Sequence, residues 1–196
     1  MGVSLTGDWG LARRLLAAGP QRLQSGINAA LRQEAHALRR EVVQGLTQQA
    51  PGGTPIRPLA PATIAARQLT GFNGTKALIE RGDMRNSVSV IVEGDEAFVG
   101  IARTARAKDG RALVDIAELH EFGGAPRVIP ITPRMRRFLF AVLRRMGVQS
   151  TGRRGRGVIV VQVPERPFLR PAFERFRVGA SRRFLERVGA EMGFGG

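Results

Sequence analysis

Apolar positions in residues 20–49 follow the spacing of one helix face. Leucine, isoleucine and valine recur on one stripe, at Leu23, Ile27, Leu31, Leu38, Val42 and Leu46, with Ala30 and Ala35 between them. This spacing predicts an amphipathic helix. Pro20 suits a first helical turn, and Pro51 followed by two glycines ends a helix, so we expect the helix over residues 21–49. Its narrow apolar stripe fits two arrangements: the helix covers its own domain, or it packs against another subunit.

The clearest strand pattern lies in residues 87–101. Val88, Val90 and Val92 alternate with other residues, and a second β-rich run covers 97–101. The four residues between the runs, 93–96, include three acids and a glycine, and this combination predicts a hairpin with a four-residue turn. The acidic turn is either a docking point for a basic neighbour or a solvated tip.

Further elements are expected after the hairpin. A short helix should end at the glycines 123–124, with glycine in a left-handed cap. Thr132 and Pro133 predict the start of a basic helix whose inner face holds Met135, Phe138, Leu139, Val142 and Met146. The run GVIVVQV, residues 157–163, predicts a buried strand. A last helix should open at Pro171, and its inner face carries Phe173, Phe176, Ala180, Phe184 and Val188.

Together these elements predict the α+β class. We expect a small mixed or antiparallel sheet around the 87–101 hairpin, flanked by the long N-terminal helix, the basic middle helix and the C-terminal helix. Composition divides the chain into a helical arm (1–50), a connector rich in proline and glycine (51–85), an α+β core (86–190) with a basic insert (125–157), and a flexible tail (191–196). A short helix opening at Pro61 is expected within the connector.

The formal net charge of +15 is concentrated in one part of the chain. Residues 127–187 contain 16 arginines against three glutamates. Such a region attracts nucleic acid or an acidic protein surface, and it is also typical of a solvated basic face. The candidates for contact with DNA or an acidic partner are Arg153, Arg154 and Arg156 in a glycine-rich loop, and Arg136, Arg137, Arg144 and Arg145 on the basic helix.

The sequence offers little for catalysis. It has no cysteine, and its two histidines are His36 and His120. His120-Glu121 begins an HExxH metal motif, but Gly124 stands where the second histidine is required. No serine-nucleophile or phosphate-loop motif occurs, so we expect no enzyme, metal or cofactor; a carboxylate-dependent nuclease is the one enzyme class left. We also expect neither a membrane span nor a signal peptide.

Several motifs, in order, resemble phage tail-completion proteins. Residues 78–88, LIERGDMRNSV, are similar to the family's L-x-x-T-G-x-L-x-x-S-I segment, with Arg81 in place of threonine and Met84 in place of leucine. The run FVGI at 98–101 and then AELHEFG at 117–123 are similar to VG followed by A-x-x-H-E-F-G. Residues 165–173, ERPFLRPAF, resemble the closing x-R-P-F-L-x-P-A-F. Residues 57–63, RPLAPAT, resemble W-x-P-L-x-x-x-T of the Mu-type virion morphogenesis branch, without its tryptophan.

This resemblance implies a structural virion protein of the phage neck or tail, made in the host cytoplasm, that completes the tail or joins head to tail. Its implied partners are other copies, in a ring that we expect to be hexameric, and other neck and tail proteins, with non-specific DNA contact through the basic face. Candidate interface residues come from the two best motifs: Arg166, Pro167, Phe168 and Leu169, and His120, Glu121 and Phe122. A phenylalanine and an arginine beside a rigid proline are typical of interface centres. Pro167 and Pro171 hold the chain extended around Phe168, so we expect Phe168 to be buried, at a subunit contact or under the final helix. The competing interpretation is a basic nucleic-acid-binding architectural protein outside any particle.

Overall fold

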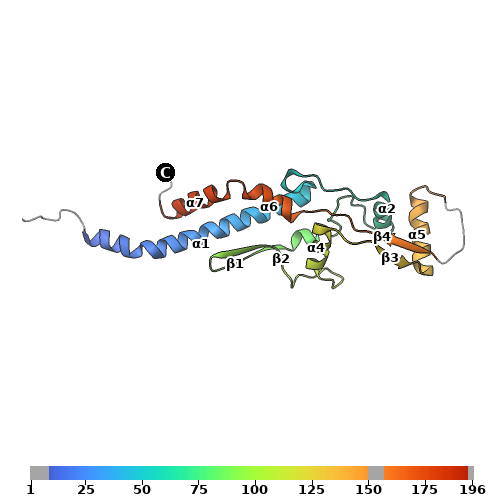
Figure 1. The fold of residues 1–196 in the computed structure, drawn as a ribbon, viewed down its shortest axis with the longest axis horizontal. Helices are drawn as coiled ribbons and strands as arrows, with labels where there is room; N and C mark the ends of the chain where they lie inside the picture. Colours follow the sequence, from blue (N-terminus) through green and yellow to red (C-terminus); the bar gives the residue numbers. More distant parts are fainter. Residues whose placement is uncertain (1–8, 150–156, 194–196) are drawn as a thin grey trace, which may run out of the picture.

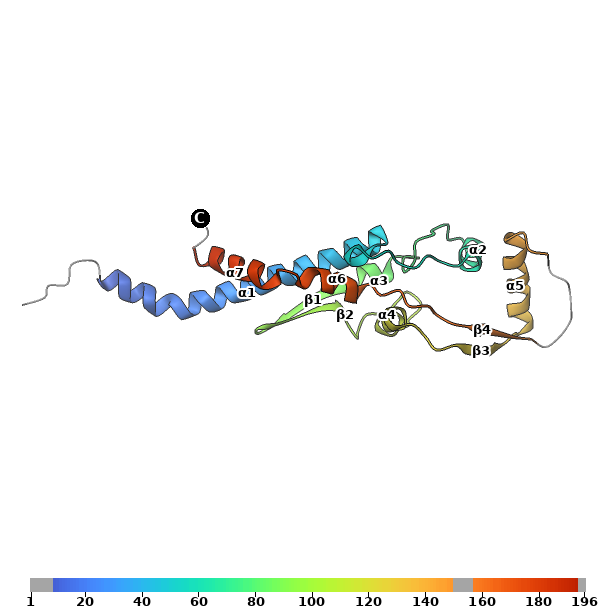
Figure 2. The ribbon, with the colours of Figure 1, turned by 45° about the horizontal axis from the view of Figure 1, so that its top comes forward.

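The computed structural model describes residues 9–149 and 157–193. In chain order the elements are α1 (Trp9–Gln48), the 3-10 turn η1 (Pro51–Gly53), α2 (Pro61–Leu69), α3 (Asp83–Asn86), β1 (Val88–Glu93), β2 (Glu96–Ile101), α4 (Leu113–Phe122), β3 (Arg127–Pro130), α5 (Pro133–Arg145), β4 (Val158–Val161), α6 (Leu169–Arg177) and α7 (Ala180–Glu191). The molecule is elongated, with the first part of α1 at one end and α5 at the other (Figures 1 and 2). The predicted α+β class is confirmed.

Helix α1 is the longest element, and the prediction that it opens at Pro20 was wrong. It begins at Trp9 and runs through Pro20. An interior proline costs roughly 3 kcal/mol because it lacks an N–H and its ring clashes with the preceding turn. The residues before it, LARRLLAA at 11–18, are strong helix formers, and they continue the helix on the far side of the proline. The predicted stop is confirmed, since the helix ends at Gln48 and Pro51 opens η1.

The hydrophobic core lies in the middle of the molecule and draws on distant parts of the chain. Val42 and Leu46 of α1 meet the hairpin, α4 and α6 there. The core also contains Ile56, Ala77, Leu78, Met84, Val88, Ile101, Leu113, Ala117, Phe168 and Ala172. The second half of α1 therefore covers its own fold. Around Leu23 the helix is exposed and extends beyond α7 (Figure 1).

The predicted hairpin is confirmed, with a shorter turn than expected. Strands β1 and β2 are antiparallel, and Val88 pairs with Ile101 at one end while Glu93 pairs with Glu96 at the other. Only Gly94 and Asp95 remain in the turn, and Gly94 has a φ of +60°. Such a φ suits a two-residue hairpin turn and favours glycine. The face that carries Val88 and Ile101 packs towards α1, and the other face is open.

A second antiparallel pair, β3 and β4, forms a separate ribbon near α5 (Figure 2). The prediction that residues 157–163 form a buried strand was wrong, because Val158 and Val160 are exposed. Branched residues favour a strand, but burial needs a second layer, and within the described residues nothing covers this face. Thr132 caps α5 as predicted, accepting a hydrogen bond from the Met135 N–H at 3.2 Å.

Helix α5 packs against α2, and its predicted inner face is only partly buried. Val142 is buried, whereas Phe138 and Met146 remain exposed. A helix at the end of an elongated molecule has one neighbouring element to pack against, so a full apolar stripe cannot be covered there.

The predicted last helix is two helices, α6 and α7. Gly179, with a φ of +71°, separates them, and Phe173 is exposed rather than on an inner face. Helix α7 is held on α1 by the buried Glu34, whose carboxylate lies 2.6 Å from Arg187 Nε and 3.3 Å from Arg183 Nη2. The break lets α7 change direction and follow α1 (Figure 1).

Candidate functional site

The two best sequence motifs meet at the centre of the molecule, where a carboxylate from one caps a helix of the other. Glu121, at the end of α4, is buried, and its Oε atoms accept hydrogen bonds from the backbone N–H groups of Phe168 (2.8 Å), Leu169 (3.1 Å) and Arg170 (2.8 Å). The first N–H groups of a helix lack partners within the helix, and the helix dipole there favours a negative charge. Glu121 therefore fixes the start of α6 relative to α4.

Arg166 joins the same junction to the connector. Its backbone N–H donates to the His120 carbonyl at 2.7 Å, and its buried guanidinium donates to the carbonyls of Arg57 (2.8 Å) and Pro58 (3.1 Å). Burial, with the nearby charges of Arg57 and Arg67, lowers the pKa of Arg166. A guanidinium stays charged even so. Arg166 thus ties three segments together through backbone groups.

Gly123 is required by close packing at this junction. A Cβ at Gly123 would lie 2.8 Å from Glu165 Cγ, and the Gly123 φ is +77°. The predicted left-handed cap is wrong in detail, because the ψ of 170° places Gly123 outside the left-handed helical region. The next N–H, of Gly124, donates to the Val163 carbonyl at 2.9 Å, so the chain leaves α4 extended alongside the approach to α6.

The predicted burial of Phe168 is confirmed, with 0% of its surface exposed. Pro167 and Leu169 are half-buried, and Leu169 packs against the core. The interface role of this set stays a prediction. Phe168, Glu121 and Arg166 lie inside one copy, so they can support a partner surface without touching it. Phe122 is 63% exposed, and it is the member placed to contact a partner.

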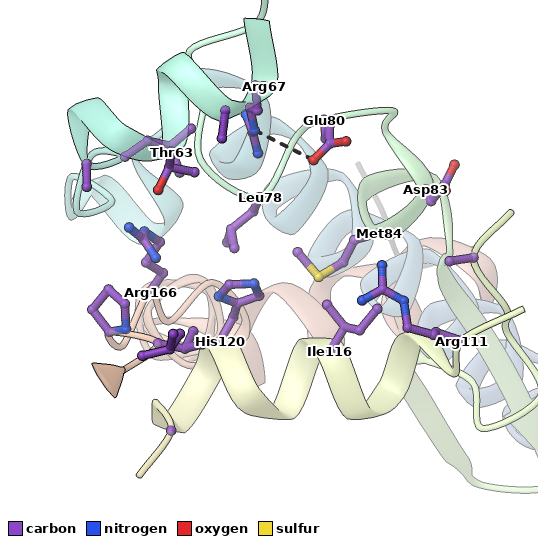
Figure 3. A pocket seen from close by; sticks show the side chains of 18 of the residues that line it. Thr63, Arg67, Leu78, Glu80, Asp83, Met84, Arg111, Ile116, His120 and Arg166 are labelled. Carbon is purple, nitrogen blue, oxygen red and sulfur yellow. Dashed lines mark ion pairs between the residues drawn. The ribbon is translucent and has the colours of Figure 1, made fainter. Parts of the chain in front are cut away.

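Beside the junction lies an open groove of about 1520 Å³ between α2, α4 and the segment that follows β4. Its floor contains Leu78, Met84 and Ile116, and its rim mixes both signs of charge (Figure 3). Arg67 Nε lies 3.6 Å from Glu80 Oε2 across this rim. The carboxylate next to His120 in sequence, Glu121, is directed to α6 rather than into the groove. The groove is thus a mixed-charge surface and not a recognisable catalytic arrangement.

His120 faces the groove (Figure 3) and is half-buried. Its Nδ1 is buried, and no group among the described residues hydrogen-bonds to it. Burial, and then the charge of Arg166, lower the pKa of His120 below its usual value. The charged form of His120 is therefore less favoured than that of an exposed histidine.

The candidate basic residues fall into two groups. Arg136, Arg137, Arg144 and Arg145 lie on α5, at the end of the molecule. Among them Arg145 Nε donates to Gln68 Oε1 of α2 at 3.0 Å. Arg153, Arg154 and Arg156 lie outside the described residues. The basic face near α5 thus remains a candidate for DNA or an acidic partner.

Several of the other arginines form ion pairs with glutamates of the same chain, which the sequence analysis did not predict. Arg183 and Arg187 bind Glu34, and Arg175 Nε lies 3.7 Å from Glu41 Oε1. Part of this pairing could be predicted from the sequence. Glu34 lies close to the apolar stripe of α1, and a carboxylate buried there needs a cationic partner. Which arginine would reach it depends on α7 folding back, and no local pattern predicts that.

Within 9–149 and 157–193, no group of three or more His, Asp or Glu side chains could hold a metal ion. None of the helices in the same ranges has the length and apolar character needed to cross a membrane.

The sequence model of the phage virion morphogenesis family matches residues 11–188, which include both motifs of the central junction and nearly all the helices. No curated protein and no solved structure matches significantly.

Proposed function

The chain belongs to the phage virion morphogenesis family, and from that premise we propose that it is a structural component of the neck or tail that completes the tail and joins it to the head. In this proposal it acts by assembling into a ring and docking other virion proteins, without catalysis. Virion morphogenesis is the role of the family; the position in the particle and the ring are the proposal.

The observation that carries the proposal is an elongated subunit with a packed hydrophobic centre and uncovered apolar surface on both sides of it. Leu23 of α1 is exposed towards one end and Val128 and Val158 near the other, while Val178 and Leu185 are exposed between them. Large exposed apolar side chains that gather on a soluble protein mark surfaces for contact. A subunit with different contact surfaces at its two ends forms head-to-tail contacts, which close into a ring when the rotation between copies permits.

A hexameric ring is expected because it matches the sixfold symmetry of phage tails that the family resemblance implies. The exposed stretch of α1 around Leu23 is the second candidate contact, since the neighbouring helix α7 ends before it (Figure 1). The basic α5 would face either the DNA passage or an acidic neighbouring ring. The competing interpretation, a nucleic-acid-binding architectural protein, explains the positive charge but does not explain the exposed apolar side chains.

The test is a phage from which this coding sequence is deleted, imaged by electron microscopy with and without the gene supplied on a plasmid. We expect filled heads and separate tails in the deletion, and joined particles on complementation. Normal particles in the deletion would overturn the proposal. Light scattering on nuclease-treated protein separates the alternatives: ring assembly should persist without nucleic acid, whereas an architectural factor should associate only with it.

A further inference from the structure

The valine face of the β3–β4 ribbon is a strongly exposed apolar surface. Register places Val128 opposite Val160 and Pro130 opposite Val158, all on one face. The exposed fractions of Val128, Val158 and Val160 are 65%, 62% and 61%. An isolated two-stranded ribbon is marginally stable in water, and it gains stability when its apolar face is covered. This face therefore lacks a partner in the single chain.

The β1–β2 hairpin presents a second open sheet face, of different character. Ile91 and Phe98 are directly opposite each other on the face turned away from α1, and they are 43% and 48% exposed. The Phe98 ring covers Gly100, where a Cβ would lie 2.9 Å from Cζ. The tip beyond them carries Glu93, Asp95 and Glu96, all exposed. This surface is apolar with an acidic end.

The charges next to the ribbon are the complement of that acidic end. Helix α5 starts three residues after β3, and its first turns expose Arg134 and Arg137. Within the described residues neither these two arginines nor the three acids of the hairpin tip form an ion pair. Exposed basic residues thus follow the ribbon directly in the chain, and exposed acidic residues lie at the end of the Ile91–Phe98 face.

The two surfaces cannot meet within one copy. The hairpin tip is directed along α1, away from α5, and the ribbon lies on the far side of α4 (Figures 1 and 2). Sheets that pack face to face bury apolar side chains between them, and complementary charges at the rim set the register and direction. Such a pairing of two different patches is heterologous, as ring closure requires.

We propose that the valine face of β3–β4 in one copy packs on the Ile91–Phe98 face of β1–β2 in the next copy, with the acidic hairpin tip against Arg134 and Arg137 of α5. The occupant of the exposed ribbon is thus a second copy of this chain. This inference rests on the ring assembly of the proposed function, and it adds the surfaces that form the contact.

Charge reversal tests the pairing. The double variants Glu93→Arg with Glu96→Arg, and Arg134→Glu with Arg137→Glu, should each raise the protein concentration for half-assembly at least tenfold, measured by light scattering. The fourfold variant carries both reversals, so each contact regains opposite charges and assembly should return to within about threefold of wild type. The exposed charges Glu118 and Arg103 lie outside both surfaces, and Glu118→Arg with Arg103→Glu serves as the matched control.

Cross-linking identifies the touching residues, because the chain has no cysteine. A mixture of the Phe98→Cys and Val160→Cys variants, treated with a short bis-maleimide, should yield a covalent dimer. The mixture of Phe98→Cys with Leu185→Cys should not. Circular dichroism and melting of the separated variants check that each one folds.

Three outcomes would overturn the inference. In one, wild type assembles but neither double variant weakens it. In another, Phe98 cross-links to Leu185 and not to Val160. In the last, wild type stays monomeric at all concentrations. The first two outcomes leave the proposed function standing, and the last also contradicts its ring assembly; the role in joining heads to tails has a separate readout, the deletion phage.

Discussion

The centre of the molecule and its α5 end use similar residue types in opposite ways. At the centre, Glu121, Arg166 and Phe168 are buried, and the two charges bind backbone groups of other segments. At the α5 end, arginines and valines lie in solvent, and the valine face meets no second layer within the described chain. Charge and apolar surface stabilise the single subunit in one region and remain available for partners in the other. Mutations should therefore act on folding at the centre and on assembly or binding at the end.

The largest effect is expected for Phe168→Ala. This side chain is fully buried in the core, so its removal loses transfer free energy and leaves a cavity, at about 3–5 kcal/mol of unfolding free energy. Urea unfolding followed by circular dichroism measures it. Val160→Ala, in the exposed ribbon at the α5 end, is the control variant. It should change the unfolding free energy of the monomer by less than about 0.5 kcal/mol. Equal losses in both variants would remove the distinction between the regions.

Glu121→Ala should have the next largest effect. It leaves three backbone N–H groups at the start of α6 without their acceptor, and we expect a loss of about 2–3 kcal/mol in unfolding free energy. Glu118→Ala on the same helix removes an exposed carboxylate and should stay within about 0.5 kcal/mol of wild type. Glu121→Gln keeps one acceptor oxygen and should fall between the two. A Glu121→Ala variant as stable as Glu118→Ala would contradict the capping role.

The basic region is expected to affect binding rather than folding. If Arg153, Arg154 and Arg156 contact DNA, their replacement by serine should reduce the slope of log affinity against log salt by up to about three, since each neutralised phosphate contributes about one. Arg137→Ser with Arg144→Ser on α5 tests the described part of the same face. Fluorescence anisotropy with duplexes of two unrelated sequences measures both. If the serine variant binds DNA with an unchanged slope but phage carrying it have unjoined heads and tails, the arginines contact an acidic protein partner. If the slope is unchanged and the particles are normal, neither DNA nor an acidic partner contacts these arginines.

The smallest effect is a pH dependence at the edge of the centre. Burial lowers the pKa of His120 in the folded state, so below its ordinary value of 6.5 the unfolded chain binds more protons. Unfolding free energy should therefore fall as the pH drops below about 6.5, and above that value His120 contributes no pH dependence. Melting between pH 8 and 5 measures this. His120→Asn should lessen the decline, whereas His36→Asn leaves His120 in place and should retain it. A decline that His120→Asn leaves unchanged would assign it to other groups.

Features written in a few neighbouring residues were predictable from the sequence. The hairpin, the Thr132 cap, the end of α4 at glycine and the burial of Phe168 beside two prolines all follow from local patterns. Each depends on turn chemistry, capping or alternation within one element, so distant residues have little influence on it. The family resemblance was likewise visible in short sequence motifs that follow one another in a fixed order.

The tertiary structure decided which roles the residues of these motifs have. Glu121 and the start of α6 are 47 residues apart at the closest bond, and the carboxylate becomes a cap only because α4 and α6 meet in space. Strand composition made β4 a strand, but whether its valines are buried depends on a second layer that the chain does not place there. By itself the sequence determined the hairpin, most of the helices, the Thr132 cap and the family. Burial, helix capping across the chain and the exposed surfaces are properties of how distant segments pack, and only the folded arrangement specifies them.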